Sequence, residues 1–133
     1  MWRPPVSGVV VDTSVWIDFL AGVPTPALED ALAHGVVVLA PVVVAELISG
    51  ARRSRDRTAI AELLAQLPLH ETHLDHWIRV GELRRNLQTH GVTASTPDAH
   101  VAQCAIDLDG VLLSRDAIFS RIVRHSALRL GRM

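Results

Sequence analysis

The sequence contains no lysine and only one cysteine. Phosphotransfer domains that place an aspartate after the first strand also need a lysine to hold the phosphoryl group, so this class is excluded. No Gly-rich loop ends in Lys and Ser or Thr, which excludes the P-loop nucleotide hydrolases. Cys104 has no partner for an internal disulfide, which indicates a reducing compartment. Its neighbours Ala102, Ala105 and Ile106 predict a small buried side chain rather than a nucleophile.

Membrane-spanning and secretory segments are also missing from the sequence. The longest apolar run, Val36–Ala45, is too short to cross a bilayer and contains Pro41. Met1–Pro5 lacks the basic-then-apolar layout of a signal peptide and is expected to lead directly into the first strand. We therefore expect a cytoplasmic protein that does not associate with membranes.

The composition predicts one globular domain over residues 1–133. Hydrophobic residues make up 49% of the chain and charged residues 20%, which leaves little room for disorder. The formal net charge of −1 provides no overall field that would attract nucleic acid, so any such binding depends on local charge.

Short runs of valine and leucine alternate with helical patterns along the chain. Strands are predicted at Val9–Val11, Val36–Leu39 and Val111–Leu113, with weaker candidates at Pro68–Thr72 and Ala127–Leu130. Helices are predicted at Thr13–Leu20, Pro26–His34, Pro41–Ile48, Ala59–Leu67, Asp75–Thr89, from Thr96 through Ala105, and from Asp116 through Val123. This alternation predicts a parallel sheet in an α/β sandwich.

Four acidic residues stand where such a sheet would gather them at one edge, at the carboxyl ends of its strands. Asp12 and Asp116 each follow a predicted strand. Asp98 lies in the first turn of a helix that has Thr96 as its predicted cap, and Glu46 is the only charge in its apolar helix. Each acid also has an ordinary explanation: an N-cap for Asp12, a helix dipole for Asp98 and Asp116, and exposure to water for Glu46.

If the four carboxylates converge, they need a cation. Two carboxylates about 5 Å apart repel each other by roughly 3 kcal/mol at an effective dielectric constant near 20. With no lysine in the chain, an arginine or a divalent ion must supply the positive charge, and oxygen ligands with open water positions suit Mg²⁺ or Mn²⁺. Such an ion polarises a phosphate and lowers the pKa of bound water, so the pattern predicts phosphodiester hydrolysis.

Four blocks in this order carry a resemblance to a known family: Val10–Ser14, Val44–Leu47, Thr96–Asp98 before an alanine-rich helix, and Leu113–Phe119. Together they resemble the PIN-domain ribonucleases, most of all the VapC-type toxins of bacterial toxin–antitoxin pairs. The resemblance implies a three-layer α/β/α sandwich with a mainly parallel five-stranded sheet, and an endoribonuclease that depends on Mg²⁺ or Mn²⁺. It also implies a homodimer and a small VapB-like antitoxin that blocks the active-site groove.

The same resemblance implies roles for individual residues. The residues that hold the metal and act in catalysis would be Asp12, Glu46, Asp98 and Asp116. The hydroxyls that support this site would be those of Thr13, Ser14 and Ser114, the last of which is often a threonine in the family. An acid two residues after Asp116 is also common in the family, but this chain has Ile118 there.

Arg52, Arg53 and Arg115 are candidate contacts for RNA phosphates, because a guanidinium group binds phosphate through two hydrogen bonds. The alternative for the arginines at 52–57 is a solvated helix end. The alternative for Arg115 is an ion pair with a neighbouring acid, and Asp18 is expected at the surface.

Other side chains are assigned without reference to RNA. Trp16 and Trp77 are predicted to be core or interface residues, with Trp77 on the same side of its helix as Val80, Leu83 and Leu87. The spacing of the histidines at 70, 73 and 76 fits no structural zinc pattern with thiolates, and three histidines across a strand–helix junction point in different directions. Zinc is therefore not predicted from these histidines.

The alternative to a nuclease is a catalytically inactive RNA- or protein-binding module with the same fold. The presence of all four acids favours the nuclease, because a binding module has no need for them.

Overall fold

A parallel β-sheet lies at the centre of the computed structural model, which describes residues 8–133. The prediction for Met1–Pro5 falls outside these residues. The sheet contains β1 (Val9–Val11), β2 (Val37–Val38) and β3 (Val111–Leu113) in the order β2–β1–β3. Val9 pairs with Val37 on one side and with Val111 on the other. All three residues of β1 are buried, as expected for a strand that is covered on both faces.

The sheet has three regular strands, where five were expected. The two remaining segments each contribute a single parallel bridge, Leu39 to Leu69 beside β2 and Leu112 to Leu130 beside β3. Pro68 and His70 still bond to Leu39 on both sides of the first bridge, with N–O distances of 2.8 Å. The expected five extended segments are therefore present, but the outer two are too short to form strands.

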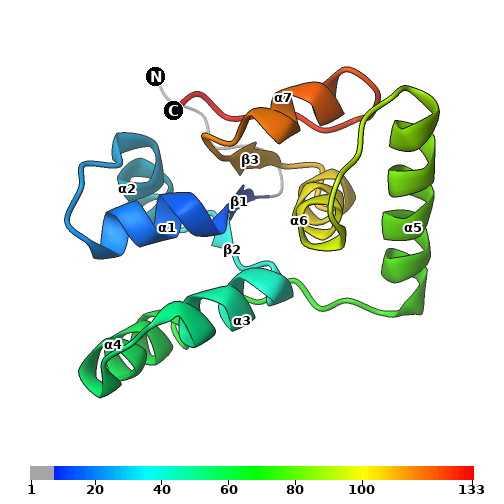
Figure 1. The fold of residues 1–133 in the computed structure, drawn as a ribbon. Helices are drawn as coiled ribbons and strands as arrows, with labels where there is room; N and C mark the ends of the chain where they lie inside the picture. Colours follow the sequence, from blue (N-terminus) through cyan, green and yellow to red (C-terminus); the bar gives the residue numbers. More distant parts are fainter. Residues whose placement is uncertain (1–7) are drawn as a thin grey trace.

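Helices cover both faces of the sheet, which confirms the predicted three-layer sandwich. Figure 1 shows α1 (Thr13–Leu20) and α2 (Pro26–Ala33) on one side of the sheet, and α6 (Thr96–Asp107) and α5 (Leu74–Thr89) on the other. The remaining helices are α3 (Pro41–Gly50), α4 (Ser54–Leu64) and α7 (Ala117–Val123). None of the helices in residues 8–133 is long and apolar enough to span a membrane.

One predicted helix start and one predicted cap were wrong. Helix α4 begins at Ser54, five residues before the expected Ala59. The prediction missed its first turn because that turn is polar and charged and carries no hydrophobic period. The cap of α6 is Ser95 rather than Thr96, since the Ser95 hydroxyl accepts a hydrogen bond of 3.2 Å from the Asp98 backbone N–H. Asp98 consequently occupies the third helical position, still within the first turn.

Small residues let α6 and the sheet approach closely. Seven consecutive residues of α6, Ala99–Ala105, are buried, and three of them are alanines. At the end of α6 the chain turns into β3 through Gly110, where an added Cβ would lie 2.2 Å from the backbone oxygen of Gly8. Only glycine fits there, so this residue sets how near the entry to β3 lies to the start of β1.

Candidate active site

Asp12 leaves the carboxyl end of β1 and caps α1, and its carboxylate collects three hydrogen bonds. Its Oδ1 accepts from the Thr13 backbone N–H at 2.9 Å. Its Oδ2 accepts from the Ser114 hydroxyl at 2.8 Å and from the Ser14 hydroxyl at 3.3 Å. Asp12 is only 9% exposed, so these donors replace most of its water. The expected N-cap is present, but the bond from Ser114, 102 residues away in the chain, goes beyond what a cap requires.

Two more of the acids, Asp116 and Glu46, are connected to the Asp12 region by hydroxyl-bearing residues. The Ser114 hydroxyl also accepts the Asp116 backbone N–H at 3.0 Å, so a single hydroxyl joins Asp116 to Asp12. The Thr13 hydroxyl donates to Glu46 Oε1 at 2.7 Å and joins α3 to the start of α1. All three hydroxyls proposed as supports therefore contact a candidate acid.

Asp98 feels the charge of the other three acids. Burial raises the pKa of its carboxyl, a hydrogen bond from Ser95 opposes the rise, and repulsion from Asp116, Asp12 and Glu46 adds to it. The structure thus gathers all four predicted acids in one electrostatic neighbourhood, with Asp12 buried, Asp98 half-buried, and Glu46 and Asp116 exposed.

None of the arginines in residues 8–133 neutralises this group. Among residues 8–133, none of the ion pairs involves any of the four acids. Arg115, which stands next to Asp116, pairs instead with Asp18. Of the two interpretations of Arg115, an RNA contact or an ion pair with a neighbouring acid, the structure shows the ion pair. Asp18 is half-buried in that pair rather than fully exposed at the surface.

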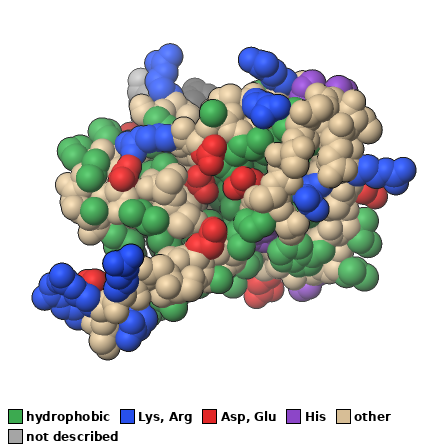
Figure 2. All heavy atoms as spheres, viewed as in Figure 1, with side chains coloured by type: hydrophobic (Ala, Val, Ile, Leu, Met, Phe, Trp, Pro, Cys, Tyr) green, Lys and Arg blue, Asp and Glu red, His purple; other side chains and the backbone are tan. Residues whose placement is uncertain are grey.

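Glu46, one of the four acids, lines a groove between α1, α3 and the start of α4. Figure 2 shows acidic side chains gathered around a hollow in the middle of this face, and arginines clustered at one end of the molecule. The groove contains Glu46 at one position and Arg52 and Arg53 at another, with apolar walls that include Ile17, Leu20, Leu47 and Ile60. In residues 8–133, the side chains of Arg52 and Arg53 form no ion pair within the chain, so both guanidinium groups remain free for a ligand.

In residues 8–133, no three of the four acids have carboxylate oxygens that all lie within 4.8 Å of one another. Within the described residues, the three-residue group whose potential ligand atoms all lie within 4.8 Å of one another is elsewhere, at His70, His76 and Cys104. Wide spacing suits Mg²⁺, which keeps several of its waters and is usually bound by only one or two carboxylates directly.

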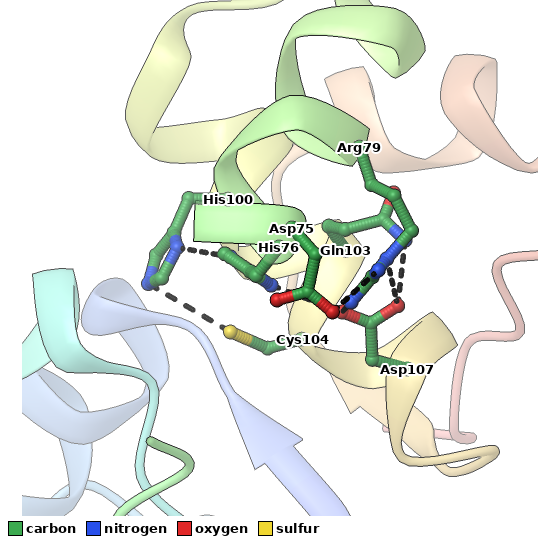
Figure 3. Close-up of polar contacts among 7 residues, drawn as sticks. All are labelled: Asp75, His76, Arg79, His100, Gln103, Cys104 and Asp107. Atoms are coloured by element: carbon green, nitrogen blue, oxygen red, sulfur yellow. Dashed lines mark hydrogen bonds and ion pairs between the residues drawn. The ribbon is translucent and has the colours of Figure 1, made fainter. Parts of the chain in front are cut away.

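A second polar cluster, which the sequence did not reveal, lies between α5 and α6 (Figure 3). His76 lies between His100 and Asp107, with N–N and N–O distances of 2.8 Å and 3.0 Å. Burial raises the pKa of Asp107, but hydrogen bonds from Arg79, Gln103 and His76 outweigh it and hold the value at about 2. Burial lowers the pKa of His100 to about 4, and the neighbouring histidines act in the same direction.

The prediction for the inner face of α5 was partly wrong at this cluster. Trp77 is 42% exposed, and His76 is buried in its place at 2%. Hydrophobic periodicity predicts the tryptophan as the buried residue, because a buried histidine needs polar partners. The partners of His76 are His100 and Asp107, which lie more than 20 residues away in the chain and leave no local signal. The Trp77 ring still covers the cluster, stacked on His100 with ring centroids 4.7 Å apart.

Three solved structures have folds similar to that of this chain. DNA-bound VapBC from Salmonella typhimurium matches with a TM-score of 0.79 and 19% identity, over 95% of this chain and 98% of that chain. VapBC2 from Rickettsia felis, bound to a DNA fragment from its promoter, gives 0.76 and 18%, over 92% and 96%. VapBC-1 from nontypeable Haemophilus influenzae gives 0.74 and 20%, over 92% and 96%.

Comparison of the sequence with curated proteins finds no match. The model of the PIN domain family, however, matches residues 9–124, a range that contains all four acids and all three supporting hydroxyls. That match covers most of the sequence, and the chain therefore belongs to the PIN domain family.

Proposed function

We propose that this protein is a divalent-metal-dependent endoribonuclease and the toxin of a toxin–antitoxin pair. The PIN domain family is a family of nucleases, and the similar solved structures are of VapBC proteins. The observation that carries the proposal is the group of four acids: the supporting hydroxyls contact three of them, those three repel Asp98, and none of the four has an arginine partner among residues 8–133.

The donor set fits Mg²⁺ or Mn²⁺, because it consists of carboxylate oxygens alone. Asp12, Glu46, Asp98 and Asp116 would hold the ion, which supplies positive charge to the scissile phosphate and lowers the pKa of bound water. Asp12 is the most rigid of these ligands, since three donors fix its two oxygens. A cation would also relieve the repulsion that raises the pKa of Asp98.

Arg52 and Arg53 would position the RNA strand. Both line the groove that leads to Glu46, and both lack an ion-pair partner in residues 8–133. We expect them to contact phosphates rather than bases, which would raise affinity without selecting a sequence. Arg115 contributes to RNA binding only if it leaves Asp18.

The same groove would receive the antitoxin. Ile17 is 55% exposed and Leu20 39% exposed in its wall, although both are large apolar side chains. A VapB-like peptide could cover them and direct a basic side chain to the carboxylates, which would block RNA and the metal together. Such a toxin would act in the cytoplasm, where its RNA substrate and antitoxin are made.

We also propose a homodimer formed through the outer face of α5. Leu74 is 75% exposed, Ile78 51% and Trp77 42%, and Leu69 beside them is 49% exposed. Replacing Leu74 and Ile78 with glutamate should yield monomers in analytical ultracentrifugation, whereas glutamate at Ile17 in the groove should leave the assembly unchanged.

The function is tested by a cleavage assay on cellular RNA with Mg²⁺ or Mn²⁺, with and without chelator. Asp98→Asn should reduce cleavage on the order of 10²-fold or more, the usual cost of removing a group that organises transition-state charge. Glu62→Gln is the matched control, because Glu62 is exposed on α4 and has no contact with the four acids. If the parent protein cuts no RNA, or if Asp98→Asn cuts as well as the parent, the nuclease proposal is wrong and a binding module becomes the better explanation.

A further inference from the structure

Three side chains from separate parts of the chain meet beside α5 and α6. They are His70 from the segment after α4, His76 from α5 and Cys104 from α6, and their potential ligand atoms all lie within 4.8 Å of one another. His76 and Cys104 are buried and His70 is half-buried. The backbone places His70 firmly, because its N–H donates to the Leu39 carbonyl at 2.8 Å.

His76 is already oriented in the way that metal-binding histidines are. Its Nδ1 lies 3.0 Å from Asp107 Oδ2, and Asp107 in turn accepts hydrogen bonds from Arg79 at 2.9 and 3.0 Å and from Gln103 at 2.8 Å. When a carboxylate accepts the Nδ1 proton, Nε2 carries a lone pair that can bind a metal, as in the carboxylate–histidine–zinc arrangement, and here this lone pair is available as the acceptor toward His100 Nδ1. This Nε2 faces the interior of the cluster, toward His100.

His100 lies next to this group, although it is not one of the three residues whose potential ligand atoms all lie within 4.8 Å of one another. Its Nδ1 lies 2.8 Å from His76 Nε2, whereas two nitrogens on one tetrahedral zinc ion, with bonds of about 2.0–2.1 Å, are about 3.3 Å apart. A small separation of the two rings would therefore admit an ion between them. The other nitrogen of His100, Nε2, lies 3.7 Å from Cys104 Sγ, so the thiol and both imidazoles already form one connected set.

We propose that His70, His76 and Cys104 form a zinc site that is distinct from the acidic metal site, with His100 as its fourth ligand once the rings of His76 and His100 separate. Imidazole and thiolate ligands select Zn²⁺ over Mg²⁺, whereas the carboxylate group has the opposite preference. Cys104 follows Asp98 by six residues on α6, which is about 9 Å along a helix, so one helix contributes to two sites of different chemistry. This inference does not depend on the proposed nuclease function.

The site would add a metal link between elements that hydrogen bonds already join, such as the contacts of His76 on α5 with His100 and Asp107 on α6. The ion would join the segment before α5, α5 itself and α6, and α6 carries Asp98 in its first turn. The sequence argument against zinc considered three histidines only, and one of them, His73, is exposed and precedes α5. In the proposed site, His100 and Cys104 of α6 take the place of His73. A spacing rule for residues 70–76 could not identify them, because they lie far away in the chain.

Binding must displace the proton of Cys104. Burial raises the pKa of this thiol to about 12, and the negative charge of Asp107 acts in the same direction. Zinc binding should therefore release a proton to the solvent and become tighter as the pH rises.

Cobalt titration of the reduced, chelator-treated full chain tests the proposal. Co²⁺ alone should produce an absorption band from thiolate-to-metal charge transfer, and Zn²⁺ should abolish the band by competition. Cys104→Ala should lose the band. Alanine is a small apolar residue that can occupy the buried position of Cys104, so the variant should still fold. Asp98→Asn should keep the band, which separates this site from the acidic one.

A second pair of variants keeps the test independent of Cys104. His70→Ala should weaken Zn²⁺ binding by about 10-fold or more, while His73→Ala, exposed in the same segment, should bind like the parent. Zn²⁺ should also raise the Tm of the parent and of His73→Ala more than that of His70→Ala. A parent protein that binds Co²⁺ without a charge-transfer band, or equal Zn²⁺ affinities for the two histidine variants, would overturn the zinc site.

Discussion

Ser114→Ala removes the hydroxyl that joins β3 to β1 at the acidic site. That hydroxyl donates to Asp12 Oδ2 at 2.8 Å, and Asp12 is only 9% exposed, so water cannot easily replace the lost donor. A hydrogen bond to a charged, buried carboxylate contributes about 2 kcal/mol. The second bond, from the Asp116 N–H, adds little because Asp116 is exposed and its N–H can bind water. We therefore expect the free energy of unfolding to fall by about 2 kcal/mol.

This loss converts into a measurable shift of the melting temperature. At about 2.1 cal/mol/K per residue, a chain of 133 residues unfolds with an entropy near 0.28 kcal/mol/K, so 2 kcal/mol corresponds to about 7 °C. Thermal and urea unfolding with chelator present would measure the change without bound metal. Ser114→Thr keeps the hydroxyl and should melt close to the parent. A melting temperature of Ser114→Ala within 1–2 °C of the parent would show that the hydroxyl does not hold Asp12.

Three further predictions concern a buried acid, a glycine and the pH dependence of metal binding. Asp107→Asn should lower stability by about 2 kcal/mol at neutral pH, since the pKa of Asp107 is held at about 2 against 3.8. This stabilisation is complete above about pH 4 and is lost as the pH falls toward 2. Urea unfolding over that range should therefore show the free energies of unfolding of parent and variant converging. Gly110→Ala should destabilise by about 3 kcal/mol in the same assay, because its Cβ would meet the Gly8 carbonyl at 2.2 Å, whereas Gly50→Ala, with open space around it, should not destabilise. Mg²⁺ affinity, measured by calorimetry, should fall in mildly acidic buffer, because protons compete with the ion for Asp98, whose pKa is raised. An Mg²⁺ affinity that is constant from neutral pH down to about pH 4 would exclude Asp98 as a ligand.

Local patterns were sufficient for most of the framework. The predicted β1, β3 and α1 have the boundaries that the structure shows, and each is a continuous apolar or periodic run that ends at a turn or a capping residue. The four acids could also be identified beforehand, because each stands at a strand end, at a helix start or alone in an apolar helix. The outer strands were only weaker candidates, since Leu69 and Leu130 each form one bridge, and a single bridge leaves no period in the sequence.

The partners of polar side chains depended on contacts that are distant in the chain. Arg115 stands beside Asp116, but it pairs with Asp18, 97 residues away, and is not held at the acidic group. His76 is buried in place of Trp77, because His100 and Asp107 on α6 satisfy both of its ring nitrogens.

The sequence by itself therefore determined the elements, the sheet at their centre and the identity of the acids, because these follow from apolar period and chain order. The tertiary structure alone decided which charges neutralise one another, which histidines are buried and where Cys104 lies relative to them. The physical reason is that a charge or a hydrogen-bonding group is stabilised by whatever lies within a few ångströms of it in space. For α5 and α6, which pack against each other more extensively than any other pair of elements in the described residues, those neighbours come from the partner helix.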